Sequence, residues 1–149
     1  MDKRNKINGT TYSIYCHLKN IEAFKMKTLK ILLAEDDTMI QRLTSYYLRR
    51  IGHTVDIASN GHEALVKFRS QHYDVVLMDI QMPEMDGLEA VKEIRKFEKG
   101  LRDAVRTIII ALTTTSNKQE CIDAGMDGYA QKPFKLEDFN KLFGNFQLI

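Results

Sequence analysis

The chain has 149 residues, of which 44% are hydrophobic and 28% are charged, and its formal net charge is +2. That length suits one domain, which can bury enough surface to be stable without a disulfide or metal staple. Cys16 and Cys121 belong to no CxxC or Cys/His cluster, so neither a zinc site nor a disulfide framework is expected. The longest apolar run, residues 108–112, is far shorter than a membrane span. These features predict a single cytoplasmic domain with no membrane segment.

Most of the excess positive charge lies near the N-terminus. Residues 1–25 hold five basic and two acidic side chains. The segment lacks the apolar region of a signal peptide, and its basic residues are too sparse for a nucleic-acid-binding arm. We interpret residues 1–27 as a tail, either disordered or preceding a true start at Met26, and residues 28–149 as the folded domain.

After the tail, short apolar runs alternate with segments of helical spacing. Residues 29–34 form an apolar run of strand length, and residues 38–50 then carry apolar side chains at helical spacing. Asp37 or Thr38 is the expected N-cap of this helix, and Gly52 closes it.

The alternation continues to the C-terminal end. The remaining predicted elements are a strand at 55–58, a helix at 60–70, a strand at 74–78, a helix from 86, a strand at 106–112, a short helix at 118–124, a strand at 127–131 and a helix at 136–146. This (βα)5 order predicts an α/β domain with a doubly wound, parallel, five-stranded sheet covered by helices on both faces. In the common strand order 2-1-3-4-5, ligands bind beyond the carboxyl ends of strands 1 and 3.

Acidic residues follow the two strands that flank this expected site. Asp36 and Asp37 come after the first strand, and Asp79 ends the third. Carboxylates held close together repel one another, and a divalent cation relieves that repulsion, so an all-oxygen cluster favours Mg²⁺. The sequence has no Gly-rich loop such as GxGxxG, which argues against a flavin or nucleotide held through its phosphates.

Two further polar residues end the neighbouring strands. Thr113 follows the fourth strand, and Lys132 follows the fifth, directly before Pro133. A hydroxyl, an ammonium group and Mg²⁺ form the kind of cradle that stabilises a transferring phosphoryl group. Asp79 ends the central strand, so it is the carboxylate best placed to attack phosphorus and form an aspartyl phosphate.

Together these segments resemble the CheY-like receiver domain of two-component response regulators, which has a flavodoxin-like fold. The resemblance runs from Lys30 to about Phe143, and the block at 79–87 is most similar to receivers of hybrid sensor kinases. The matching blocks are residues 31–37 (ILLAEDD), 79–87 (DIQMPEMDG), 109–113 (IIALT), 125–129 (GMDGY) and 132–134 (KPF).

The resemblance implies a role for each matching residue. Asp79 is implied as the phospho-acceptor, and Lys132 as the partner of the phosphoryl oxygens, with a cis peptide bond before Pro133. Thr113 would turn toward the phosphate, and Tyr129 would swing inward behind it. The implied Mg²⁺ ligands are Asp36, Asp37, Asp79 and the backbone carbonyl of Gln81.

The implied function is phospho-acceptance in a two-component phosphorelay. The phosphoryl group would come from a phosphohistidine on a histidine kinase or a histidine phosphotransfer protein. The modified domain would then signal through an altered protein-binding surface, and hydrolysis would reset it. The chain stops at Ile149, so no DNA-binding or catalytic output domain is expected, and the domain is interpreted as a signalling protein rather than an enzyme.

Two other functions stay open at this point. A Mg²⁺-dependent phosphatase can also work through an aspartyl phosphate, but such enzymes usually carry a second Asp two residues later, where this chain has Gln81, and a substrate cap. A structural receiver that never takes phosphate would fail to bind Mg²⁺. The segment between Thr113 and Lys132 is also about one helical turn shorter than the family leads us to expect, and residues 114–117 predict a polar loop there.

Overall fold

The computed structural model describes residues 27–103, 105–114 and 118–148. The predicted tail therefore lies outside the described residues, apart from Lys27, as does most of the predicted polar loop at 114–117. In chain order the elements are β1 (Lys30–Ala34), α2 (Thr38–Arg50), β2 (Thr54–Ala58), α3 (Gly61–Ser70), β3 (Val75–Asp79), α4 (Gly87–Lys99), β4 (Ile108–Thr113), α5 (Lys118–Ala124), β5 (Gly128–Gln131) and α6 (Leu136–Asn145).

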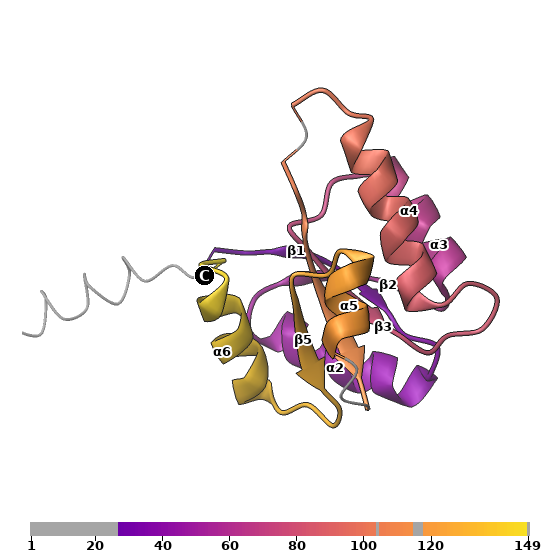
Figure 1. Ribbon diagram of the computed structural model, residues 1–149. Helices are drawn as coiled ribbons and strands as arrows, with labels where there is room; N and C mark the ends of the chain where they lie inside the picture. The colour runs from indigo at the N-terminus through magenta and orange to yellow at the C-terminus, as the bar shows by residue number, and fades with distance from the viewer. Residues whose placement is uncertain (1–26, 104, 115–117, 149) are drawn as a thin grey trace, which may run out of the picture.

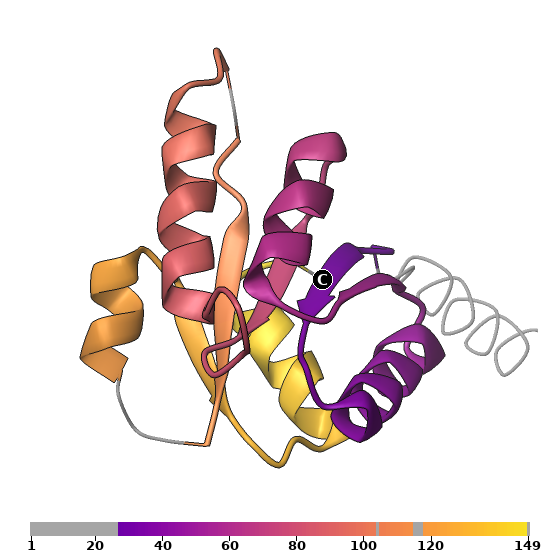
Figure 2. The same cartoon turned by 90° about the vertical axis from the view of Figure 1, so that its right-hand side faces the viewer.

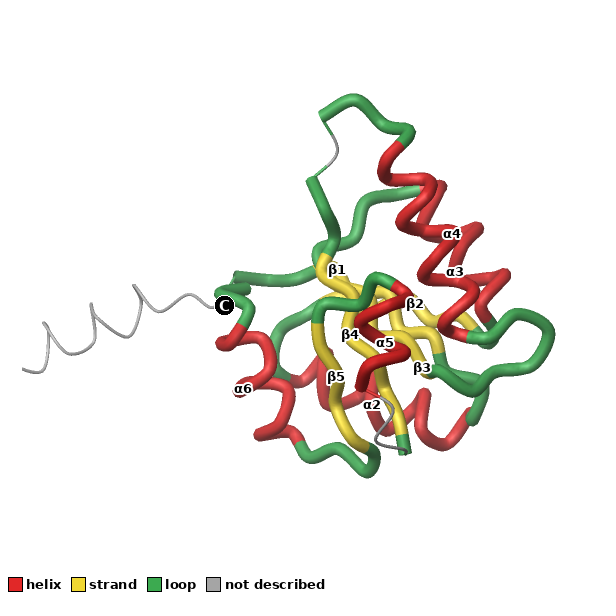
Figure 3. The backbone as a smooth tube through the Cα atoms, viewed as in Figure 1, coloured by secondary structure: helices red, strands yellow, loops and turns green. Residues whose placement is uncertain are grey.

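The five strands form one parallel sheet in the order β2-β1-β3-β4-β5, which confirms the predicted topology (Figure 1). Each strand is followed by a helix, so the tube in Figure 3 alternates between yellow and red along the chain. β3 occupies the centre, and all five of its residues are buried. The first residue after each strand therefore lies at the same edge of the sheet, where the candidate functional residues are expected.

Alternate side chains of the strands point to opposite faces of the sheet, and each face has its own apolar core. On one face, Leu32 and Val76 pack with side chains from α3, α4 and α5. On the other, Leu33 and Leu77 pack with Leu48 and with residues of α6. The sheet is therefore a middle layer, with α3, α4 and α5 on one side and α2 and α6 on the other (Figure 2).

Helices α2, α3 and α4 follow β1, β2 and β3, and each begins directly after a residue whose side chain caps it. Asp37, Asn60 and Asp86 are the N-caps of α2, α3 and α4, and each side chain accepts backbone N–H groups of the first turn. Such caps satisfy donors that have no partner inside the helix. The loops that carry the acidic residues are thus fixed at their helical ends.

Helix α2 buries a more polar face than its apolar spacing suggests. Its buried residues are Gln41, Thr44, Ser45 and Leu48. Met39 and Leu43, by contrast, are 74% and 49% exposed. The part of α2 nearest the acidic loops therefore packs polar groups inward and presents apolar groups to the outside.

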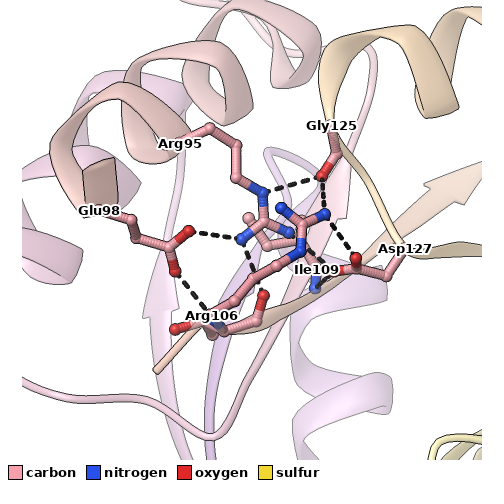
Figure 4. A network of polar contacts seen from close by, with 7 residues as sticks. Arg95, Glu98, Arg106, Ile109, Gly125 and Asp127 are labelled. Carbon is pink, nitrogen blue, oxygen red and sulfur yellow. Dashed lines mark hydrogen bonds and ion pairs between the residues drawn. The ribbon is translucent and has the colours of Figure 1, made fainter. Parts of the chain in front are cut away.

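A buried arginine ties the C-terminal half of α4 to the strands beside it (Figure 4). Arg95 donates to Glu98 and Asp127 at 2.7 Å each, and also to the carbonyls of Thr107 and Gly125. Asp127 in turn accepts from the backbone N–H of Ile109 at 2.8 Å. The network joins α4, the start of β4 and the α5–β5 connection.

Across the parts of the chain that the structure describes, no helix combines the length and the apolar character needed to cross a membrane.

Candidate functional site

The candidate site lies at the carboxyl edge of the sheet, where three strand ends converge. Glu35 directly follows β1, Asp79 is the last residue of β3, and Lys132 directly follows β5. β1 pairs with β3, which brings the first two residues side by side. Lys132 reaches them from the far edge strand, since it contacts both carboxylates.

Three carboxylates form the core of the site. Glu35, Asp36 and Asp79 each offer an oxygen, and these oxygens lie within 4.8 Å of one another. Glu35 and Asp79 are buried, whereas Asp36 is exposed. A compact all-oxygen donor set with one exposed member fits a hard cation such as Mg²⁺, which keeps part of its water shell.

Lys132 supplies the positive charge of the site. Its Nζ lies 3.0 Å from Asp79 Oδ2 and also forms an ion pair with Glu35 Oε2. Burial on its own lowers the pKa of Lys132, but the hydrogen bonds to Glu35 and Asp79 outweigh that effect and raise it. The ammonium group therefore stays charged at physiological pH and holds the two buried carboxylates together.

Glu35 has the most perturbed carboxyl group of the site. Burial raises its pKa from 4.5 to about 6, and the nearby charge of Asp79 adds to the shift, although Lys132 opposes it. Removing a carboxylate from water disfavours its charged form, which explains the direction. A cation bound at the cluster would favour the ionised form.

The structure gathers Glu35, rather than Asp37, with Asp36 and Asp79. Glu35 was not among the predicted ligands. The Asp37 carboxylate caps α2 and accepts from Met39 N–H at 2.8 Å and Ile40 N–H at 3.0 Å, and its predicted role as a Mg²⁺ ligand stays a prediction. The physical reason is that Asp37 is already turned into the first turn of the helix, whereas Glu35 still belongs to the strand edge.

The loop after β3 folds back onto Asp79. The backbone N–H of Gln81 donates to Asp79 Oδ1 at 3.2 Å, while the Mg²⁺-ligand role of the Gln81 carbonyl stays a prediction. Gly87 packs so closely that a Cβ there would lie 2.0 Å from the Asp79 carbonyl oxygen. Only glycine allows that approach, which explains why the Asp86-Gly87 pair opens α4 at this point.

Thr113 lies on β4, the strand next to β3, and Tyr129 lies on β5, the edge strand beyond it. Thr113 is buried at the end of β4, and its carbonyl accepts the N–H of Lys132 at 2.8 Å. Tyr129 lies on β5 and is 41% exposed, with Lys118 Nζ 4.5 Å from its ring centroid. The Lys132–Pro133 peptide bond is cis, as predicted.

Residues 31–143 match the response regulator receiver domain. The chain belongs to this family. Hybrid signal transduction histidine kinase K of Dictyostelium discoideum is 40% identical over 122 residues, which are 78% of this chain and 10% of the kinase. Transcriptional regulatory protein ResD of Bacillus subtilis is 38% identical over 108 residues, or 70% of this chain and 42% of ResD. The chain thus spans less than half the length of these relatives.

Solved receiver structures share the fold. The receiver domain of sensor histidine kinase PA1611 from Pseudomonas aeruginosa, with a magnesium ion coordinated in its active site cleft, is 34% identical, with a TM-score of 0.70 over 80% of this chain and 97% of that one. The receiver of Saccharomyces cerevisiae Ssk1, crystallised with the histidine phosphotransfer protein Ypd1, is 30% identical, with a TM-score of 0.74 over 83% and 94%. This chain is a receiver domain of the two-component phosphorelay type.

An apolar groove borders the acidic site of this receiver, and the sequence analysis did not foresee it. The groove has a volume of about 210 Å³ and is lined by Ile40, Leu43, Thr44, Tyr47, Thr114, Lys132, Pro133 and Phe134. The lining comes from α2 and from the segments after β4 and β5. The signal for it in the sequence is the apolar spacing within residues 38–50, which by itself predicts only a helix.

Proposed function

We propose that this receiver accepts a phosphoryl group on Asp79, using Mg²⁺ held at Glu35, Asp36 and Asp79. The donor would be a phosphohistidine on a histidine kinase or a histidine phosphotransfer protein. The proposal rests on one observation. The carboxylates of Glu35, Asp36 and Asp79 lie close together, and Lys132 Nζ lies 3.0 Å from Asp79 Oδ2. The reacting unit would be residues 28–149, and we place the reaction in the cytoplasm, because Cys16 and Cys121 belong to no disulfide or zinc motif of the sequence.

The proposed transfer uses Asp79 as the nucleophile. One of its carboxylate oxygens attacks phosphorus in line, an O–P bond forms, and the N–P bond of the phosphohistidine breaks, returning its electron pair to the imidazole. When bound, Mg²⁺ would neutralise charge on the phosphoryl oxygens and orient them. Because Asp79 sits on the central buried strand, its position is fixed before the donor arrives.

Lys132 and Thr113 would stabilise the product. Lys132 already contacts Asp79, so it can transfer its ion pair from the carboxylate to a phosphoryl oxygen without moving far. The Thr113 hydroxyl would turn to the phosphate, and Tyr129 would leave its exposed position beside Lys118 and move inward. In this way the chain would catalyse its own phosphorylation, and later its own dephosphorylation, and would change its surface on the β4–β5 side.

The apolar groove beside the site gives the donor a place to dock. Leu43 and Tyr47 of α2 line it together with Pro133 and Phe134, and Lys132 belongs both to the groove and to the acidic site. A donor protein that buries an apolar surface here would present its phosphohistidine close to Asp79.

The test is the intact mass of the chain after incubation with acetyl phosphate, with and without Mg²⁺. We expect one added phosphoryl group that requires Mg²⁺ and is absent from Asp79→Asn. Asp37→Asn is the matched control, because it removes the same charge two residues from Glu35 while asparagine still caps the helix. An adduct that persists in Asp79→Asn, or steady release of phosphate from small esters, would contradict the proposal, and the latter would favour a phosphatase.

A further inference from the structure

The pairing of β1 with β2 stops just where the acidic loop begins. The last paired residues are Ala34 and Ala58, and one more hydrogen bond follows, from Glu35 N–H to the Ala58 carbonyl at 3.0 Å. β2 then ends, and Asn60 caps α3. The strand ladder therefore offers no further donor to the carbonyl of Glu35, although a buried carbonyl without a partner is costly.

A side chain from α2 takes over at this position. The Nε2 group of Gln41 donates to the Glu35 carbonyl, and also to Ser59 Oγ at 3.3 Å. Gln41 is only 9% exposed. Its own backbone N–H donates to the Asp37 carbonyl at 2.9 Å. The turn from Glu35 to Asp37 is thus held at its first carbonyl by the Gln41 side chain and at its last carbonyl by the Gln41 backbone.

This clamp bears directly on the carboxylate cluster. The carbonyl of Glu35 belongs to the peptide unit that joins Glu35 to Asp36, so its orientation sets the directions in which both side chains leave the backbone. We propose that Gln41 is a positioning residue for the Mg²⁺ site, which fixes Glu35 and Asp36 in a geometry suited to the cation. The inference rests on the proposed function, because it takes the cluster to bind Mg²⁺.

The experiment measures Mg²⁺ affinity of the full chain by isothermal titration calorimetry. Gln41→Met keeps the length of the side chain but removes the amide donor, and we expect the dissociation constant for Mg²⁺ to rise about tenfold, the scale of other groups that orient metal ligands. Gln71→Met is the matched control. Gln71 also donates hydrogen bonds through its side-chain amide, to Asp56 and Tyr73, far from the acidic loop.

The comparison separates positioning from general stability. Both variants lose amide hydrogen bonds and should unfold at a somewhat lower temperature, but only Gln41→Met should bind Mg²⁺ more weakly. A dissociation constant within twofold of the wild-type value in Gln41→Met would overturn the inference. Equal weakening in Gln71→Met would overturn it as well, because the effect would then follow from lost stability.

A second readout needs no metal. Hydrogen exchange of the Glu35 amide, measured by NMR without Mg²⁺, should be faster in Gln41→Met and unchanged in Gln71→Met. The Glu35 amide donates to the Ala58 carbonyl, and Gln41 holds the groups on either side of that hydrogen bond, the Glu35 carbonyl and the Ser59 hydroxyl. Unchanged exchange in Gln41→Met would show that Gln41 does not hold the turn. If the wild-type chain binds no Mg²⁺, the proposed function fails and the metal part of this inference fails with it, while the exchange result still decides whether Gln41 holds Glu35.

Discussion

Lys132 is the only described residue that forms ion pairs with two carboxylates of the site, Glu35 and Asp79. It therefore has two opposing effects. It stabilises the metal-free fold, because it neutralises buried charge, and it competes with a bound cation for the same oxygens.

Lys132→Met should separate these effects. Without Mg²⁺, we expect the free energy of unfolding to fall by about 3 kcal/mol, since a buried ion pair loses one partner. The dissociation constant for Mg²⁺ should fall severalfold, because the cluster keeps three carboxylates and loses its competing cation. Urea unfolding and Mg²⁺ titration check the two effects, with the exposed Lys141→Met as control. Unchanged stability or weaker Mg²⁺ binding in Lys132→Met would contradict this account.

Asp36 and Asp37 are adjacent and chemically alike, yet the structure gives them different tasks. Asp37→Ala should lower the free energy of unfolding by about 1 kcal/mol through loss of the α2 cap, and should leave Mg²⁺ affinity nearly unchanged. Asp36→Ala should do the reverse, because its exposed carboxylate belongs to the acidic cluster and caps no helix among the described residues. Chemical unfolding and Mg²⁺ calorimetry on both variants check this. Loss of Mg²⁺ binding in Asp37→Ala would restore the ligand role predicted for Asp37.

This pair also shows what the sequence can predict about the site. Asp79, Thr113 and Lys132 could be placed at strand ends, because parallel strands end at one edge of the sheet. Whether Glu35 or Asp37 joins the acidic cluster depends on the residue at which the chain passes from the strand to the helix, and apolar spacing does not define that residue. Asp37 is predicted both as a possible N-cap and as a Mg²⁺ ligand, and the structure shows the first of these roles.

At the scale of elements, predicted boundaries fall close to the helices and strands found, because Gly, Asp and Asn mark most of the turns. The face that each helix buries was harder to predict for α2. Apolar spacing predicts the helix itself, but the structure buries the polar Gln41 and Thr44 on its inner face. Gln41 lies inward because the Glu35 carbonyl and the Ser59 hydroxyl at the strand ends accept its amide hydrogen bonds.

The network around Arg95 connects α4 to the start of β4 and to the segment between α5 and β5 (Figure 4). Arg95→Met should lower the free energy of unfolding by about 3–5 kcal/mol, because Glu98 and Asp127 would stay buried without their cation. Lys96→Met is the control. Lys96 is 80% exposed and pairs with Glu93 only at 3.9 Å, so its loss should change stability by about 0.5 kcal/mol or less. Equal effects of the two variants in urea unfolding would contradict the role assigned to Arg95.

His53 links the stability of the folded domain to pH. The ring is buried against Phe143 of α6, and its Nδ1 accepts from Leu29 N–H at 3.2 Å. Its Nε2 has no hydrogen-bond partner within the described part of the chain. Burial lowers the pKa of His53 below its ordinary value of 6.5, against a smaller opposing effect of Asp74.

The sign of the pH dependence follows from that shift. Below pH 6.5 the unfolded chain takes up a proton that the folded chain binds less well, so the contribution of His53 to stability is lost as the pH falls. Glu35, with its pKa raised to about 6, contributes the opposite slope in the same range. The difference between wild type and His53→Phe isolates the histidine: the wild type should lose stability relative to the variant from pH 7 to pH 5. A constant difference would contradict this, and the exposed His72→Gln serves as control.

Lys132 and Glu35 are separated by 97 positions along the chain, and their meeting depends on every strand between them taking its place. A nascent or partly unfolded chain carries the same residues but cannot assemble them. Any partner that recognises the assembled cluster therefore binds the folded chain and not the unfolded one.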